Sequence, residues 1–195
     1  MITKLKYGNT NTYFVRENAS GLLIDTDYAG TLQAFFKEIK KNNIVIGDIT
    51  YVLATHYHPD HIGLVSELME MGIKLLLIDT QTEHIHFADE LFARDHKTDY
   101  KPIREKDAVV LRCEDSRDFF ALNLGIKGEI ISTASHSEDS IAVILDDGSC
   151  IVGDLEPIDY VNAYEHNHRL KSDWKHILSY HPKAIYYGHT NEKRF

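Results

Sequence analysis

Residues 55–61, Thr55-His56-Tyr57-His58-Pro59-Asp60-His61, place three histidines and one aspartate directly after the apolar run 49–54. Neutral imidazole and carboxylate are ligands that suit zinc, iron and manganese. His56 and His58 lie two residues apart, so in extended backbone their side chains point the same way. Asp60 and His61 follow the bend at Pro59 and can face a second point in space. One short loop after a strand could therefore supply ligands to two metal ions.

Taken alone, this segment could also be a histidine-rich surface loop. The rest of the chain supplies partners, because three further residues of the same types each follow an apolar, strand-like run. These residues are His136 after 129–135, Asp154 after 150–153 and His189 after 184–188. Any one of them would by itself be interpreted as a loop or capping residue. Together, the four strand ends carry five histidines and two aspartates, which is enough for two metal ions.

Length and composition predict one globular domain, spanning residues 1–195, with a full hydrophobic core. The hydrophobic content of 43% and the charged content of 26% are ordinary for such a domain. The net charge of −9 disfavours a general nucleic-acid-binding protein, whose affinity depends on neutralising phosphates. A local basic patch is the alternative at 94–106, which holds five Lys or Arg against three Asp or Glu. A solvated loop is the simpler interpretation of that segment.

Cysteine usage and the absence of targeting signals favour a cytoplasmic protein. Cys113 and Cys150 form no C-x-x-C motif, so a disulfide scaffold is not expected, and Cys150 lies in an apolar run typical of the core. The N-terminus lacks the apolar segment of a signal peptide, and no apolar run approaches the length of a membrane span. We expect a small-molecule substrate and neither a membrane nor a nucleic-acid partner.

Hydrophobic periodicity predicts strands and helices in both halves of the chain. Strands are expected at 2–7, 12–16, 21–25, 49–54, 74–78, 108–112, 129–133, 141–145, 149–153 and 184–187. Helices are expected at 30–42, 62–71, 81–93, 115–123 and 172–180. This distribution favours an α/β fold in which two sheets pack face to face with helices outside. The candidate ligands would then gather along one edge, where strands of both halves end.

With these motifs the chain resembles the metallo-β-lactamase-fold superfamily of hydrolases, over about residues 11–190. The matching segments are 56–61, His136-Ser137-Glu138-Asp139-Ser140, Gly153-Asp154-Leu155, Gly188-His189-Thr190, and the opening pair Asn11-Thr12-Tyr13-Phe14 and Leu23-Ile24-Asp25-Thr26. The metal motif is similar to that of glyoxalase II and the lactonases. The resemblance implies a four-layer αββα sandwich of two mixed sheets flanked by helices.

The resemblance also implies a ligand set for two divalent metal ions. It assigns His56, His58 and His136 to the first metal, Asp60, His61 and His189 to the second, and Asp154 to both. Zn²⁺ is expected, with iron and manganese as alternatives.

Such a centre predicts a hydrolase that uses a metal-bridging hydroxide. Two metals can share a water and lower its pKa from about 16 toward about 7, while one of them polarises the substrate oxygen. Asp60 has two expected roles, as a ligand and as the catalytic acceptor that orients the hydroxide. Asp25 and Asp79, each at the end of an apolar strand, could orient ligand imidazoles or could be turn residues.

Departures from the family patterns narrow the substrate. Asp154 stands where the main class of true β-lactamases has Cys, which disfavours an antibiotic hydrolase. Hydroxyacylglutathione hydrolases are similar at every metal position but carry a further C-terminal domain, whereas this sequence ends at Phe195. The tRNA-processing nucleases of the superfamily are longer and carry an RNA-gripping arm. We therefore expect a small ester, thioester, lactone or phosphodiester as substrate.

Two alternatives from other classes remain open. The persulfide dioxygenases resemble this chain at several of the same positions, bind a single iron and consume oxygen. A non-catalytic metal-binding protein that has kept the fold is the second alternative, although a full ligand set speaks against it.

Some further residues are weaker candidates. Tyr160 and Tyr164 follow Asp154, in a region where related lactonases are similar in placing a substrate-contacting tyrosine, but their positions do not match that motif. Four histidines form H-x-H pairs without a partner set and are expected on the surface: His84, His86, His166 and His168.

Overall fold

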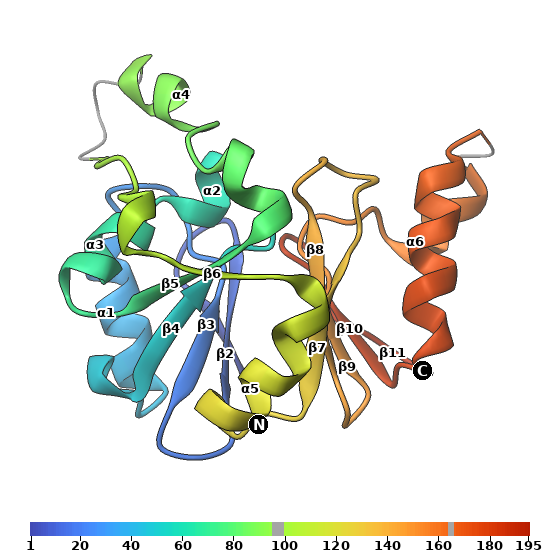
Figure 1. The fold of residues 1–195 in the computed structure, drawn as a ribbon, viewed down its shortest axis with the longest axis horizontal. Helices are drawn as coiled ribbons and strands as arrows, with labels where there is room; N and C mark the ends of the chain where they lie inside the picture. Colours follow the sequence, from blue (N-terminus) through green and yellow to red (C-terminus); the bar gives the residue numbers. More distant parts are fainter. Residues whose placement is uncertain (95–99, 164–165) are drawn as a thin grey trace.

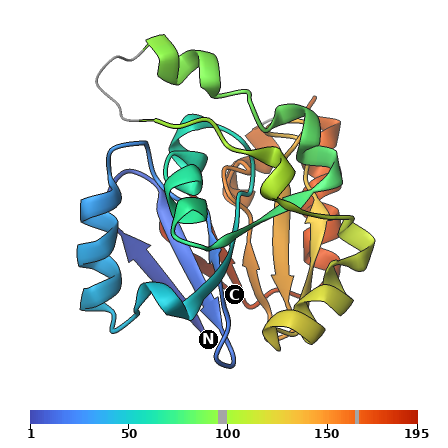
Figure 2. The same ribbon diagram turned by 60° about the vertical axis from the view of Figure 1, so that its left-hand side comes forward.

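The computed structural model describes residues 1–94, 100–163 and 166–195, which form two β-sheets packed face to face with helices outside (Figure 1, Figure 2). Both sheets are mixed. In the first, β3, β4, β5 and β6 run parallel, and β2 pairs antiparallel with both of its neighbours, β1 and β3. In the second, β9 and β10 run parallel and the other pairings are antiparallel. The four-layer αββα sandwich, an α/β fold, is therefore confirmed.

The first sheet has the strand order β1-β2-β3-β4-β5-β6 and the second the order β11-β10-β9-β8-β7. The strands of the first sheet are β1 (Ile2–Lys6), β2 (Asn11–Arg16), β3 (Gly21–Ile24), β4 (Ile49–Leu53), β5 (Lys74–Ile78) and β6 (Val109–Leu111). Those of the second are β7 (Gly128–Ser132), β8 (Ile141–Leu145), β9 (Ser149–Ile151), β10 (Ala184–Tyr186) and β11 (Lys193–Arg194). Strand β11 is too short for a period-two pattern to reveal it.

The α-helices are α1 (Leu32–Lys41), α2 (Pro59–Ile62), α3 (Val65–Glu70), α4 (Asp89–Arg94), α5 (Ser116–Leu124) and α6 (His168–Ser179). Short 3₁₀ helices are η1 (Ile46–Asp48), η2 (Asp79–His84), η3 (Glu105–Asp107), η4 (Cys113–Asp115) and η5 (Ile158–Ala163). Each helix of the described residues falls short of the length and apolar character that a membrane crossing requires. Both cysteines are free, and Cys150 is buried in β9, as expected.

The expected helix at 62–71 is interrupted, because α2 ends at Ile62 and α3 begins at Val65. Gly63, between them, packs against the main chain of residues 27–29. A Cβ atom at Gly63 would lie only 2.1 Å from the amide nitrogen of Ala29, so only glycine allows this approach. Hydrophobic periodicity continues across both helices and cannot reveal an interruption that depends on a tertiary contact.

Gly63→Ala should destabilise the protein by about 2–3 kcal/mol, because the added methyl group must displace backbone atoms rather than a flexible side chain. Gly47→Ala is the matched control, since nothing lies within 4 Å of a Cβ atom built there. Urea unfolding followed by circular dichroism measures both variants. If Gly63→Ala were as stable as Gly47→Ala, the close approach of the two segments would be wrong.

The expected helix at 81–93 is also divided, into the 3₁₀ helix η2 and the α-helix α4. Gln81 accounts for the irregular start, because its buried side chain turns inward and its Oε1 accepts a hydrogen bond from the Ile78 N–H at 3.2 Å. The helical periodicity of this segment arises from the apolar residues Ile85, Ala88 and Phe92, which are buried. Such a pattern does not show in which direction a glutamine side chain points.

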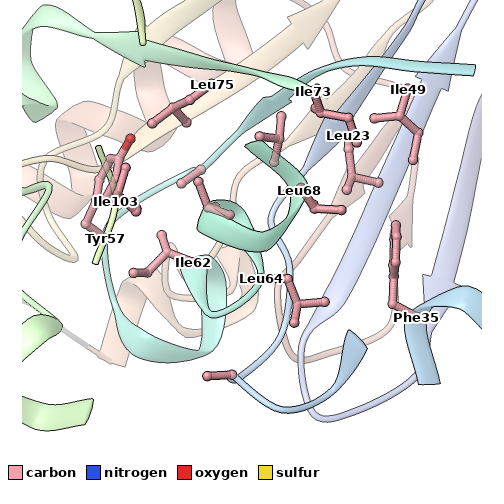
Figure 3. Packing of buried hydrophobic residues seen from close by; sticks show 14 of the residues in the cluster. Leu23, Phe35, Ile49, Tyr57, Ile62, Leu64, Leu68, Ile73, Leu75 and Ile103 are labelled. Carbon is pink, nitrogen blue, oxygen red and sulfur yellow. The ribbon is translucent and has the colours of Figure 1, made fainter. Parts of the chain in front are cut away.

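Buried apolar side chains of the described residues form three clusters that hold the layers together. In the first, between the first sheet and its covering helices, Phe35 of α1 faces Leu23 and Ile49 (Figure 3). The second lies between the two sheets and includes Phe120 of α5, and the third packs Trp174 of α6 against the second sheet. Because both faces of each sheet are covered, β3 and β8 are apolar throughout and do not alternate.

The candidate ligands lie where strands of both sheets end. Because β3, β4 and β5 run parallel, their carboxyl ends share one edge of the first sheet, and β9 and β10 do the same in the second. The segment 55–61 follows β4, and α2 carries its last residues at the upper edge in Figure 1. The loops after β7, β9 and β10 carry His136, Asp154 and His189.

Candidate metal centre

The seven residues expected as metal ligands gather in two groups. The first group contains His56, His58 and His136, and the second contains Asp60, His61, Asp154 and His189. Within each group, one potential ligand atom from every residue lies within 4.8 Å of the others. The histidines and Asp60 divide as expected from the sequence. Metal ions could therefore bind in both groups.

Asp154 lies between the two groups and faces both. Its Oδ2 atom is 3.3 Å from Nε2 of His61 and 3.1 Å from Nε2 of His189, both in the second group. The same oxygen is 4.0 Å from Nε2 of His56 in the first group. This carboxylate is thus placed where a ligand shared by two ions would be required.

The first group consists of imidazoles from loops that follow strands of two different sheets. The His56 and His58 rings follow β4 and have centroids 4.4 Å apart, whereas His136 follows β7 and places Nε2 3.4 Å from His58 Nδ1. Within the part of the chain that the structure describes, the buried Nε2 of His56 and Oδ1 of Asp154 have no hydrogen-bond partner. Leaving such atoms unpaired costs about 1–3 kcal/mol each. The lone pairs of these two unpaired atoms are available to bind metal ions, so the atoms fit a metal site.

The second group combines two carboxylates with two imidazoles. Asp60 Oδ2 lies 3.1 Å from His189 Nε2 and 3.8 Å from His61 Nε2. The same oxygen accepts a hydrogen bond from Thr10 Oγ1 at 3.3 Å. The negative charge of two carboxylates favours a divalent cation, and mixed oxygen and nitrogen ligands suit zinc, iron and manganese.

The pKa values of His56 and His136 in the first group shift in the opposite direction to that of His61 in the second. Burial lowers the pKa of His56 well below its ordinary value, with a further contribution from four neighbouring histidines, and burial also lowers the pKa of His136. These imidazoles are therefore neutral, which is the form that binds metals. Burial opposes a charge on His61 as well, but Asp25 and Asp154 outweigh it and raise the pKa of His61 to about 10. A metal ion in the second group would have to displace that proton.

Asp25 supports ligands of both groups from behind. Its Oδ2 atom is 3.0 Å from His61 Nδ1 and accepts a hydrogen bond from Thr55 Oγ1 at 2.9 Å, and that hydroxyl is 3.1 Å from His56 Nδ1. Because Asp25 holds Nδ1 of His61, the Nε2 atom is left to face the other members of the second group. Asp25 is fully buried and has a φ of +59°, a strained conformation that persists only where surrounding contacts impose it. Of its two interpretations, the structure supports the orienting residue.

None of the weaker candidates within the described residues belongs to either group, although His84 lines a cavity beside His58. Asp79 is an exposed turn residue whose Oδ1 accepts a hydrogen bond from the Thr80 N–H at 2.9 Å. Tyr160 lies in η5 and is 56% exposed, and Tyr164 lies outside the described residues. Of the H-x-H histidines, those exposed as expected are His86, His166 and His168, whereas His84 is half-buried.

Cavities flank the ligand groups, and two of them are larger than 150 Å³. One of about 240 Å³ borders the second group and is lined in addition by Leu155, Glu156, Pro157, Tyr187 and Thr190. The other, of about 200 Å³, lies beside His58 and is lined by His84, Phe87, Ser137, Glu138 and Asp139. The Phe87 ring is 55% exposed and its centroid is 5.5 Å from that of His58. A small molecule could therefore reach the ligand groups from either side.

Two buried polar residues near the first group were missed by sequence reasoning. Gln81 Nε2 donates hydrogen bonds to the carbonyl oxygens of Ala54, at 3.0 Å, and Asp139, at 3.1 Å. The Asp139 carboxylate accepts a hydrogen bond from the Tyr57 N–H at 2.6 Å. Asp139 lies in a motif segment quoted above, but its partner is 82 residues away, and Gln81 carries no sequence signal at all.

Comparisons with known proteins agree with this geometry. The family model for the metallo-beta-lactamase superfamily matches residues 5–189. The chain is 24% identical over 193 residues to "Beta-lactamase-like protein 2 homolog" of Caenorhabditis elegans, which covers 92% of this chain and 55% of that protein. It is 27% identical over 159 residues to a "Probable metallo-hydrolase" of Methanocaldococcus jannaschii, covering 79% of this chain and 71% of that protein. The chain thus spans about half the length of the Caenorhabditis relative.

A solved structure shows the same fold. It is the crystal structure of a protein in a di-iron-bound form, with a TM-score of 0.72 and 21% sequence identity. The match covers 100% of this chain and 94% of the crystallised one.

Proposed function

The chain belongs to the metallo-beta-lactamase superfamily, most of whose members are metal-dependent hydrolases, and we propose that it is a hydrolase with a binuclear metal centre. The position of Asp154 carries this proposal. Its Oδ2 atom lies 3.1–4.0 Å from imidazole nitrogens of both ligand groups. A carboxylate shared in this way supports two ions at adjacent positions.

The proposed ligands of each ion come from one of the two groups, with Asp154 shared. His56, His58 and His136 would hold the first ion, Asp60, His61 and His189 the second, and Asp154 would bind both. When bound, the two ions would activate a water for attack and polarise the oxygen of the scissile bond. Zn²⁺ suits this mixture of imidazole and carboxylate. Iron is the first alternative, supported by the structural relative in its di-iron-bound form.

The residues of this chain would orient the reacting groups. Asp60 would bind the second ion and accept a hydrogen bond from the attacking water, while its contact with Thr10 Oγ1 restricts rotation of the carboxylate. Asp25 would keep Nε2 of His61 directed at the second ion. No serine or cysteine nucleophile is required by this scheme.

The substrate that the site supports best is a small ester, thioester or lactone, with a phosphodiester as the less favoured choice. The flanking cavities of about 200 and 240 Å³ suit a small molecule. Their linings combine apolar side chains, Phe87 and Leu155, with the carboxylates of Glu138 and Glu156. Because like charges repel, these carboxylates disfavour an anionic phosphodiester more than an uncharged ester or lactone.

Elemental analysis tests the proposal directly. Protein purified without chelators or a metal-binding tag should contain about two equivalents of zinc, iron or manganese per chain, as a two-metal centre requires. Hydrolysis should then be found in a panel of esters, thioesters, lactones and phosphodiesters. One equivalent of iron with oxygen uptake on glutathione persulfide would support the mononuclear dioxygenase instead. Protein that binds no metal even after reconstitution would exclude the catalytic assignment and leave only the fold.

A further inference from the structure

A buried glutamine joins the two loops that carry the first ligand group. The Gln81 side chain is fully buried, and its Nε2 donates hydrogen bonds to Ala54, just before the 55–61 segment, and to the carbonyl of Asp139. Its Oε1 accepts a hydrogen bond from the Ile78 N–H at the end of β5. An amide has two N–H donors, so both donors of Gln81 are used between the two loops.

Asp139 continues this connection to the ligand histidines themselves. It is 4% exposed, and its Oδ2 accepts a hydrogen bond of 2.6 Å from the N–H of Tyr57, the residue between His56 and His58. Asp139 also lies three residues after His136 on the same loop. Hydrogen bonds therefore run from Gln81 through Asp139 to the main chain at Tyr57. They connect the two loops that carry all three imidazoles of the first group.

The packing of the two sheets does not by itself require the buried side chains of Gln81 and Asp139. Burying an amide and a carboxylate costs free energy that an apolar pair would not. A main-chain hydrogen bond from the Ile141 N–H to the Thr55 carbonyl, 2.9 Å long, already joins the two sheets nearby. The hydrogen bonds of Gln81 and Asp139 add to this main-chain bond. They lie where ligand atoms of His56, His58 and His136, which follow strands of different sheets, come within 4.8 Å of one another.

The second ligand group has a support that does not involve Gln81 or Asp139. His61 is held directly by Asp25, whose Oδ2 lies 3.0 Å from Nδ1 of the imidazole, whereas Asp25 reaches His56 of the first group only through the Thr55 hydroxyl. In the described parts of the chain, the hydrogen bonds of the Gln81 and Asp139 side chains go to the main chain of the first group's loops and of β5. Disturbing them should therefore move the first group relative to the second.

We propose that Gln81 and Asp139 are positioning residues that set the metal affinity of the first ligand group and leave that of the second unchanged. The inference rests on the binuclear centre proposed above. Residues that orient ligands from behind typically change metal affinity by about 10- to 100-fold when replaced. The expected signature is thus a selective weakening of one of two binding steps.

Titration of the metal-free protein with Co²⁺, followed by visible absorption and calorimetry, separates the two steps. Gln81→Met keeps the length of the side chain and removes its hydrogen bonds, and Asp139→Ala removes the acceptor for Tyr57. Each should weaken one step by about 10- to 100-fold and leave the other within about twofold. Asp139→Asn retains an acceptor oxygen and should restore binding. Gln33→Met, the same substitution at an exposed glutamine of α1, should have no effect.

The outcomes distinguish this inference from the proposed function. Wild-type protein that binds no Co²⁺ would overturn both. Wild-type protein that binds two equivalents, with variants that lose neither step or lose both equally, would overturn the positioning role alone. If Gln81→Met does not fold, Asp139→Ala and Asp139→Asn test the same connection at its other end. A lower melting temperature of the metal-free variants with unchanged Co²⁺ affinities would show that the two residues are structural only.

Discussion

Asp154→Ala is expected to yield a folded protein that retains about one metal equivalent per chain or less and has lost almost all hydrolase activity. The change removes the carboxylate whose Oδ2 faces His56, His61 and His189. Loss of a shared ligand should release at least one ion, and a catalytic metal contributes several kcal/mol of transition-state stabilisation. We therefore expect kcat to fall by about a thousandfold or more. Elemental analysis and the assay on the best substrate of the panel measure both effects.

Two further variants make this result specific. His136→Ala removes a ligand of the first group only, so the second group should keep its ion while activity is still lost. Asp79→Ala is the matched control, because Asp79 is an exposed aspartate at a strand end whose Oδ1 accepts a hydrogen bond from the Thr80 N–H and which belongs to neither ligand group. Circular dichroism should show that all three proteins are folded. Full activity in both Asp154→Ala and His136→Ala would exclude a two-metal mechanism.

Asp25→Ala should lower the free energy of unfolding of the metal-free protein by about 3–5 kcal/mol. The substitution takes the acceptor away from the Thr55 N–H and hydroxyl, and it removes the carboxylate beside His61 Nδ1. Each buried donor left unpaired costs about 1–3 kcal/mol. Alanine also tolerates the φ of +59° less well than aspartate does. Urea unfolding in the presence of a chelator gives the free energy without any contribution from bound metal.

Asp25→Asn is the conservative comparison for this prediction. Asparagine tolerates the same backbone conformation and keeps one acceptor oxygen, so its loss of stability should be clearly smaller than that of Asp25→Ala. A loss of less than about 1 kcal/mol in Asp25→Ala would mean that the Asp25 contacts do not hold the ligand loop in place.

The prediction from sequence succeeded where a structural signal is local. Strands such as β4 and β8 are apolar runs buried on both faces, and their residue types alone indicate them. Helix limits were less accurate, because the break at Gly63 depends on the approach of another segment and the irregular start at Gln81 on an inward-turned side chain. Periodicity contains neither kind of information.

The candidate site shows the same division. Residue types and their places after strands were sufficient to predict which side chains lie together at the candidate site, because potential metal ligands are recognised by their own chemistry. These residues are His56, His58, Asp60, His61, His136, Asp154 and His189. The arrangement around them was not. Asp139 reaches the Tyr57 N–H across 82 residues, and Gln81 reaches both loops from a third segment. Such hydrogen bonds exist only where folding brings distant backbone groups within about 3 Å, and no local pattern records that approach. The supports that hold the ligands in place were therefore decided by the tertiary structure alone.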